Sequence, residues 1–174
     1  REFVIQVKGE VNERSNKNAN LSTGDIEIIV SELDVLNTAA TPPFTIEDNS
    51  DGGDDIRMKY RYLDLRRNAV RSNLELRHKM TIEVRSYLDK LGFLEVETPI
   101  LQPIYGGANA RPFVTKLEAL NLKVFLRIAP ELYLKRLIVG GWENIYEIGK
   151  CFRNEGLDRE HNPEFTLLEL YSAY

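Results

Sequence analysis

The stretch CFRNEGLDREHNPEFTLLELY, residues 151–171, places charged and imidazole side chains between two hydrophobic runs. The segment that leads into it, ENIYEIGKCFR (residues 143–153), alternates polar and apolar residues with the period of two that is typical of a β-strand. Alternation resumes after a loop that is rich in Asn, Gly, Asp and Pro. The pattern therefore predicts a β-hairpin whose charged loop is too long for a tight turn.

Alternation also predicts which side chains of the hairpin share a face. Arg153, Glu169 and Tyr171 can project from one face of the sheet, beside Phe165. A phosphate favours Arg as its partner, and a nucleotide base favours an aromatic ring. A cation, carboxylates, the imidazole of His161 and an aromatic ring therefore favour a nucleotide site over the alternative, a solvated charged loop.

Composition sets broad limits on the chain. It has 174 residues, a hydrophobic fraction of 43% and a net charge of -4, enough for one domain and part of another but without an overall basic surface. Residues 56–79 concentrate Arg and Lys, which fits either a solvated basic helix face or an RNA contact. Cys151 is the single cysteine, which excludes an intrachain disulfide and a multi-cysteine zinc site, and we expect no bound structural metal.

No signal peptide and no apolar run of membrane length is visible, so we expect a cytoplasmic protein without a membrane partner. Residues 1–40 have the pattern of β-strands, mainly within residues 1–11 and 26–37. Residues 41–56 are rich in Pro, Gly and Asp and form the best candidate for a linker between domains.

Residues 57–174 have the pattern of an α+β domain with antiparallel strands. One apolar stripe predicts a helix that ends at Gly92, a natural C-cap, and consists of Met80, Val84, Tyr87, Leu88 and Leu91. We expect short strands within residues 93–99 and near residues 124–128. Pro130 can begin a second helix, with Glu131 in its first turn and Gly140–Gly141 at its end.

Three segments carry a resemblance to a known family: FLEVETPIL (93–101), FRNEG (152–156) and HNPEFT (161–166). They resemble motifs 1 and 2 of the class II aminoacyl-tRNA synthetases, in the subgroup that charges lysine, aspartate and asparagine. The resemblance covers essentially the whole chain. It implies an antiparallel sheet flanked by helices, preceded in residues 1–40 by the C-terminal strands of an OB-fold anticodon-binding domain. It also implies a homodimer through motif 1, about Arg77 to Pro99.

The resemblance implies ATP-dependent activation of an amino acid as an aminoacyl-adenylate, with Mg²⁺ accompanying the ATP, followed by transfer to tRNA. Arg153 would be the catalytic residue, because it would contact both the α-phosphate and the carboxylate of the amino acid. The implied ATP-binding residues are Arg153, Glu155, His161, Asn162 and Phe165. No general base is required, because the attacking carboxylate is already ionised at neutral pH.

The two parts of the chain resemble different members of the subgroup. Residues 1–101 resemble bacterial aspartyl-tRNA synthetase, and residues 102–174 resemble lysyl-tRNA synthetase. The lysyl pattern implies an amino-acid pocket formed by Gly107, Glu131, Arg153, Glu169 and Tyr171. Two carboxylates and a phenol suit an ammonium group and would repel the side chain of aspartate.

The negative charges of the implied pocket therefore predict a lysine enzyme, with an aspartate enzyme or a non-catalytic binding module as alternatives. The aspartyl pattern has a lysine where this chain has Leu134. Lys135 is one position further on, which turns it about 100° around a helix from that position. The family's third motif, which carries another ATP-binding arginine, is not found before Tyr174. We therefore expect either a piece of a longer protein or a hybrid of two genes, with weak or no aminoacylation by the chain alone.

Overall fold

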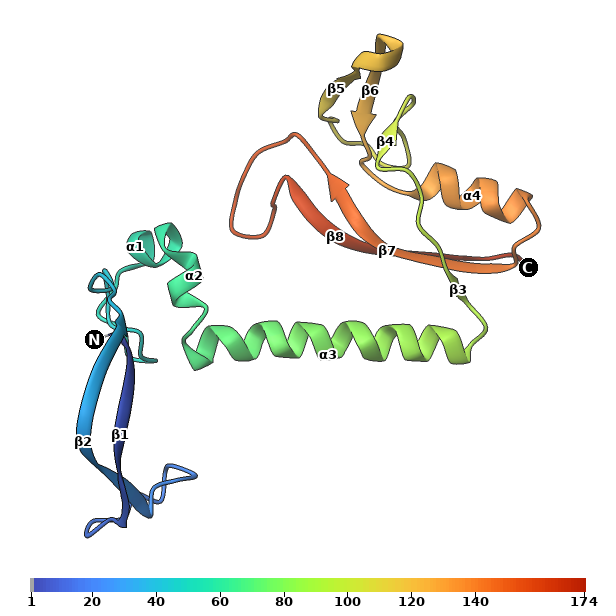
Figure 1. Ribbon diagram of the computed structural model, residues 1–174. Coiled ribbons are helices and arrows are strands. Elements are labelled where there is room, and N and C mark those ends of the chain that lie inside the picture. The colour runs from blue at the N-terminus through green and yellow to red at the C-terminus, as the bar shows by residue number, and fades with distance from the viewer. Residues whose placement is uncertain (1) are drawn as a thin grey trace. The chain divides into compact units, whose positions relative to one another are not determined.

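The computed structural model describes residues 2–174 (Figure 1). The chain divides into two compact units, the first ending at Glu75 and the second beginning at Leu76. This boundary lies within the helix α3 (Asn68–Lys90). No helix among the described residues is both long enough and apolar enough to cross a membrane.

The first unit begins with an antiparallel hairpin of β1 (Val4–Glu13) and β2 (Ile26–Asn37). Both strands were predicted from alternation, and β2 has the predicted bounds. Register shifts between Val4 and Ile5 and between Lys8 and Gly9 bend the ladder. In the described part of the chain these strands form a two-stranded sheet, so a closed OB-fold barrel remains an expectation.

The linker predicted for residues 41–56 contains neither helix nor strand until α1 (Asp54–Lys59) begins near its end. The short helix α2 (Arg61–Asp64) follows, and then α3. Two aspartates in the first turn of α1 stabilise it, because the N-terminus of a helix carries a partial positive charge.

A buried ion pair attaches the linker to the beginning of α3. Asp64 is fully buried and pairs with Arg61 and, at 2.8 Å, with Arg67. The Arg67 guanidinium also donates hydrogen bonds to the carbonyl oxygens of Glu47 at 2.9 Å and Asp48 at 2.7 Å. The hydrogen bond from Arg67 holds the pKa of Asp64 below its usual range. Charged side chains thus hold the linker in place, although it has no helix or strand over most of its length.

The second unit contains two three-stranded sheets, with strand orders β3-β7-β8 and β4-β6-β5. Its elements after α3 are β3 (Leu94–Glu95), β4 (Leu101–Gln102), β5 (Val114–Leu117), a 3-10 turn (Glu118–Leu120), β6 (Leu122–Leu126), α4 (Glu131–Val139), β7 (Asn144–Phe152) and β8 (Glu164–Ser172). The β7–β8 hairpin confirms the prediction from alternation, and its long loop joins the two strands at one end (Figure 1).

One part of the predicted sheet is wrong. The sheet was expected to be antiparallel, but β3 pairs with β7 in parallel, through Leu94–Ile145 and Glu95–Tyr146. Parallel neighbours require a long connection, which the segment from β4 through α4 supplies. The strands β4 and β5 were not predicted, because two and four residues are too few to show a period.

Glycines end both helices of the second unit, as predicted. Gly92 follows α3 with φ +78°, and Phe93 N–H donates to the carbonyl of Leu88 at 3.0 Å. Gly141 follows α4 with φ +98°. Both backbone angles lie in the left-handed region that favours glycine. Pro130 immediately precedes α4 instead of being its first residue, so Glu131 occupies the first turn as expected.

The apolar stripe predicted on α3 is largely exposed. Only Leu88 is buried, whereas Met80, Tyr87 and Leu91 expose more than half of their surface. Near its end, α3 is tied to the sheet by polar contacts: Arg85 binds both oxygens of Glu95 at 2.9–3.0 Å. That hydrogen-bonded arginine lowers the pKa of the Glu95 carboxyl.

The core of the second unit lies where α4 packs on the β7–β8 hairpin, and Leu134, Ile145 and Cys151 are fully buried there. We expect Leu134→Ala to lower the free energy of unfolding by about 2–5 kcal/mol, because it leaves a cavity in this core. Val139→Ala at the exposed end of the same helix should change it by less than about 0.5 kcal/mol. Urea unfolding measures both values, and equal values would contradict this position for the core.

Candidate functional site

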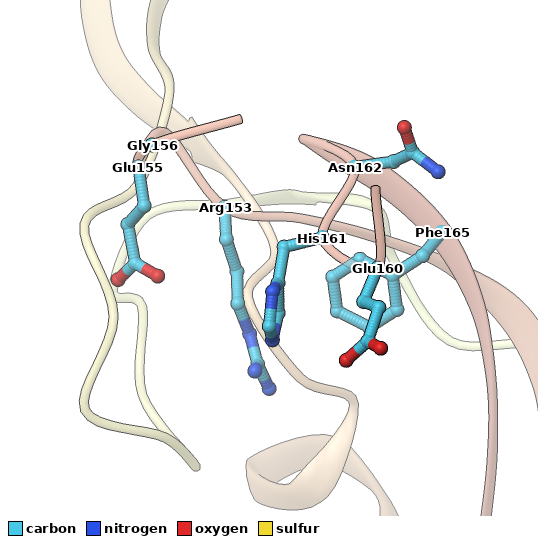
Figure 2. Close-up of a pocket in the computed structure, with 7 residues that line it drawn as sticks. All are labelled: Arg153, Glu155, Gly156, Glu160, His161, Asn162 and Phe165. Carbon is cyan, nitrogen blue, oxygen red and sulfur yellow. The ribbon is translucent and has the colours of Figure 1, made fainter. Parts of the chain in front are cut away.

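A cavity of about 220 Å³ lies at the loop end of the β7–β8 hairpin (Figure 2). All five residues predicted to contact ATP line it. Gly156 and Glu160, which were not predicted, complete a lining that consists of Arg153, Glu155, Gly156, Glu160, His161, Asn162 and Phe165. The hairpin therefore brings a cation, two carboxylates, an imidazole and an aromatic ring around one space.

Arg153 follows directly on β7, and its backbone N–H donates to the carbonyl of Pro163 at 2.9 Å, which closes the loop. Its guanidinium lies over the ring of Phe165, 5.0 Å from the centroid. Figure 2 shows the Arg153 and His161 side chains extending in the same direction, beside Phe165. Within the described residues the buried Nε of Arg153 has no hydrogen-bond partner. A buried donor in this condition is available to a ligand.

Asp158 organises the loop around His161. Its Oδ1 accepts the backbone N–H groups of Glu160 and His161, both at 2.7 Å, and its Oδ2 lies 2.7 Å from His161 Nδ1. These hydrogen bonds lower the pKa of the Asp158 carboxyl, and the bond from the Glu160 amide has the largest effect. Sequence reasoning missed Asp158; the only signal was a short polar side chain three residues before a histidine.

A second loop supports the cavity from the side. The backbone N–H of Arg111 donates to Glu155 Oε1 at 3.1 Å, and the Arg111 carbonyl accepts the N–H of Asn154 at 2.7 Å. Arg111 belongs to the glycine-led loop at residues 106–113. Glu155 is therefore held by this loop as well as by its own hairpin.

Of the five residues predicted to bind the amino acid, four lie in two close pairs, and Arg153 lines the cavity described above. Tyr171 donates its hydroxyl to Glu169 Oε1 at 2.7 Å, and burial, reinforced by that carboxylate, raises the pKa of Tyr171. Gly107 has φ +87°, and a Cβ at this position would lie 2.7 Å from the Cβ of Glu131. Glycine thus permits close contact between its loop and the beginning of α4.

Lys135 also belongs to this group of residues. Its Nζ lies 2.5 Å from Glu131 Oε1 and 5.8 Å from the centroid of the Tyr171 ring. Lys135 lies off the position of Leu134, as the turn of about 100° predicts, but this turn does not separate it from the other pocket residues, because residues four apart on a helix lie on one face. Leu134, by contrast, is fully buried in the core. The spacing of Glu131 and Lys135 was the signal that could have found this pair.

The register of β7 and β8 places Phe165, which lines the cavity, on the same sheet face as Glu169 and Tyr171. Cys151 pairs with Phe165 and Glu147 pairs with Glu169, and directly paired residues of antiparallel strands point to the same side. Phe165 and Glu169 are four residues apart along β8 and therefore share that face. A ligand that spans both groups would lie along the hairpin.

Comparison with known proteins places the chain in a family. Residues 53–174 match the family described as tRNA synthetases class II (D, K and N), where the letters denote aspartate, lysine and asparagine. The chain belongs to this family. The resemblance of the hairpin to class II motif 2 is thereby confirmed at the level of the class and its subgroup.

Three curated members of the class II synthetases are similar over the whole chain, and each is an aspartate–tRNA ligase. The proteins from Bacteroides thetaiotaomicron, Bacteroides fragilis and Phocaeicola vulgatus are 63%, 62% and 61% identical to it. Each match covers 100% of the chain and 30% of the relative. The chain therefore spans less than a third of the length of these curated relatives.

These relatives overturn the prediction of a lysine enzyme, since their similarity includes the part of the chain that carries the pocket residues. The charges of these residues do not select lysine, for two physical reasons. Every amino acid has an α-ammonium group that carboxylates such as Glu131 and Glu169 can bind, so these residues do not select lysine. Lys135 also adds a cation to the same group of residues, so the charge of this group is less negative than the carboxylates alone indicate.

Proposed function

We propose that the chain is the ATP- and aspartate-binding portion of an aspartate–tRNA ligase. The observation that carries the proposal is the sheet face shared by Phe165, Glu169 and Tyr171 of the β7–β8 hairpin. At the loop end of the hairpin a cation, two carboxylates, an imidazole and an aromatic ring line one cavity, and a mixed-charge cluster lies further along. The names of the similar proteins supply aspartate as the amino acid.

In the nucleotide cavity, Phe165 would stack on the adenine and Arg153 would contact the α-phosphate. Glu155 would bind ATP, His161 would reach the distal phosphates and Asn162 would lie near the adenine. The contact of the Arg153 guanidinium with the Phe165 ring supports this assignment, because it holds the cation next to the aromatic face that a base requires.

In the amino-acid cluster, Glu131, Glu169 and the hydroxyl of Tyr171 would bind the α-ammonium group, and Gly107 would contact the backbone of the amino acid. Lys135 would pair with the side-chain carboxylate of aspartate, as the only cation within contact distance of Glu131 among the residues that the structure describes. Together these groups offer acceptors for one end of aspartate and a donor for the other.

The reaction requires little covalent chemistry from the protein. An oxygen of the α-carboxylate of aspartate attacks the α-phosphorus of ATP, pyrophosphate leaves, and a mixed anhydride forms; a tRNA hydroxyl then attacks the carbonyl carbon and releases AMP. Arg153 would stabilise the negative charge that develops on the phosphoryl oxygens. It would also hold the attacking carboxylate in place.

Mg²⁺ fits this site as a partner of ATP and not as a resident ion of the protein. In residues 2–174 no group of three or more His, Cys, Asp or Glu side chains could hold a metal ion. Mg²⁺ commonly binds through substrate phosphates, water and one or two carboxylates, and Glu155 and Glu160 border the cavity. The ion would neutralise part of the phosphate charge.

The remaining partners follow from the same proposal. The exposed apolar residues of α3, within the segment of about Arg77 to Pro99, would bind a second copy of the chain. Residues 1–40 would belong to a tRNA-binding OB-fold, with residues 41–56 as the linker to the catalytic domain in residues 57–174.

Ligand-dependent thermal unfolding tests the proposal. We expect a non-hydrolysable aspartyl-adenylate analogue to raise the Tm of the chain and a lysyl-adenylate analogue to have little effect, because a ligand that binds only the folded state stabilises it. AMP alone serves as the control for the nucleotide part. The absence of any shift with the aspartyl analogue, or a larger shift with the lysyl analogue, would contradict the function proposed here.

A further inference from the structure

Arg127 is a fully buried arginine of the second unit, with 1% of its surface exposed, between the end of β6 and the beginning of α4. Its guanidinium pairs with Glu147 at 2.5 Å, donates from Nε to the carbonyl of Lys150 at 2.8 Å and donates from Nη1 to the hydroxyl of Thr98 at 3.0 Å. Thr98 in turn donates to the other oxygen of Glu147 at 2.6 Å. No individual role was predicted for any of these residues, although Thr98 lies within the motif 1 segment.

The backbone of Arg127 makes two further connections. Its N–H donates to the carbonyl of Ile100, and its carbonyl accepts the N–H of Phe152, both at 2.9 Å. Ile100 precedes β4, and Phe152 ends β7. One residue therefore joins the two three-stranded sheets, through its side chain and its main chain together.

This junction lies between the two groups of site residues. In one direction, Phe152 is followed immediately by Arg153, which lines the nucleotide cavity. In the other direction, Glu131 comes four residues after Arg127 and contacts both Gly107 and Lys135. A shift of Arg127 would therefore change the distance between the nucleotide residues and the amino-acid residues.

The strand that faces Arg127 leaves space for its guanidinium. A Cβ at Gly149 would lie 2.1 Å from Arg127 Nη2 and 2.9 Å from Glu147 Oε1, which is too close for any larger residue. Gly149 is in the middle of β7, where glycine forms a weaker strand than other residues do. Its presence there is explained by the close approach of the arginine.

Stability alone does not account for this arrangement. A buried ion pair is a weak source of stability, because removing both charges from water offsets their attraction, and apolar pairs of similar volume often serve as well. The hydrogen bonds from Arg127 instead fix the geometry between three separate segments, which an apolar pair could not do.

We propose that Arg127 is a positioning residue that sets the distance between the ATP-binding and the aspartate-binding groups, so that one aminoacyl-adenylate contacts both. The proposal rests on the function proposed above. Arg127 itself touches neither ligand; it acts through Arg153 on one side and Glu131 on the other. If Arg127 has this role, the affinity for a ligand that spans both groups depends on Arg127 more strongly than the affinity for either half of that ligand does.

The test compares the parent chain with Arg127→Met/Glu147→Gln, which removes both buried charges and keeps an acceptor for Thr98. Leu88→Ala is the control, because it creates a cavity in the same unit without touching the Arg127 network. For each protein, calorimetry gives the Kd of ATP, of aspartate and of a non-hydrolysable aspartyl-adenylate analogue, and thermal unfolding gives the Tm.

We expect the double variant to bind ATP and aspartate within about twofold of the parent and the analogue about tenfold or more weakly, because small misplacements weaken a ligand that needs both groups at once. The control should keep all three affinities, whatever its Tm. Unchanged analogue binding in the double variant, or an equal loss for all three ligands, would overturn the positioning role. If the parent chain binds neither ATP nor the analogue, the proposed function itself fails.

Discussion

Arg153→Ala is expected to weaken ATP binding by about 100-fold, because hydrogen bonds between a guanidinium and a phosphate contribute roughly 1.5–3 kcal/mol each. The fold should be unaffected, since the Arg153 contact that closes the loop is made by the backbone N–H and survives the substitution. The substitution also breaks no hydrogen bond at Nε of Arg153, because this atom has no partner in the protein. Calorimetric titration with ATP measures the effect, and circular dichroism checks the fold.

Arg159→Ala is the matched control for Arg153→Ala. Arg159 belongs to the same hairpin loop and carries the same charge, but it is exposed and does not line the cavity. Its removal should change the ATP affinity by less than about threefold, the effect of a screened surface charge. If both variants lose affinity to the same extent, the loop attracts ATP by its overall charge and Arg153 has no specific role.

The grouping of Arg153, Glu155, His161, Asn162 and Phe165 around one cavity could be predicted because these residues belong to one hairpin. β8 alternates between partly buried and exposed residues, and this period of two reveals which residues share a face. The register that brings Cys151 opposite Phe165 then follows from local pairing. Neither the order of the strands nor the residues that contact the loop from elsewhere, such as Arg111, leaves a comparable trace in the sequence.

Two groups of residues were not predicted from the sequence, for different physical reasons. Arg127, Thr98 and Glu147 form one network from three distant segments, and a buried ion pair of this kind has no periodic pattern. Lys135 was dismissed from the angle of its helix position, although a long flexible side chain reaches the residue one turn earlier. Reach and charge balance, not face alone, decide which residues form a pocket.

Lys135→Gln provides the second large expected effect. We expect it to weaken binding of the aspartyl-adenylate analogue by about 10–100-fold, because it removes a charge-assisted contact to the side-chain carboxylate of aspartate. It also leaves the negative charge of Glu131 without its cation, so that carboxylate would repel the side-chain carboxylate of aspartate, although it could still accept the α-ammonium group. Stability should change little, since an ion pair between helix residues four apart contributes only about 0.3–0.5 kcal/mol.

The control for Lys135→Gln is Lys116→Gln on β5, which removes the same charge from an exposed pair with Glu118. The lysyl-adenylate analogue completes the experiment. Lys135→Gln should improve its binding relative to that of the aspartyl analogue, because Glu131 then becomes available to an ammonium group. An equal loss for both analogues would mean that Lys135 supports the structure of the pocket and does not read the side chain of the amino acid. No loss for either would remove Lys135 from the site.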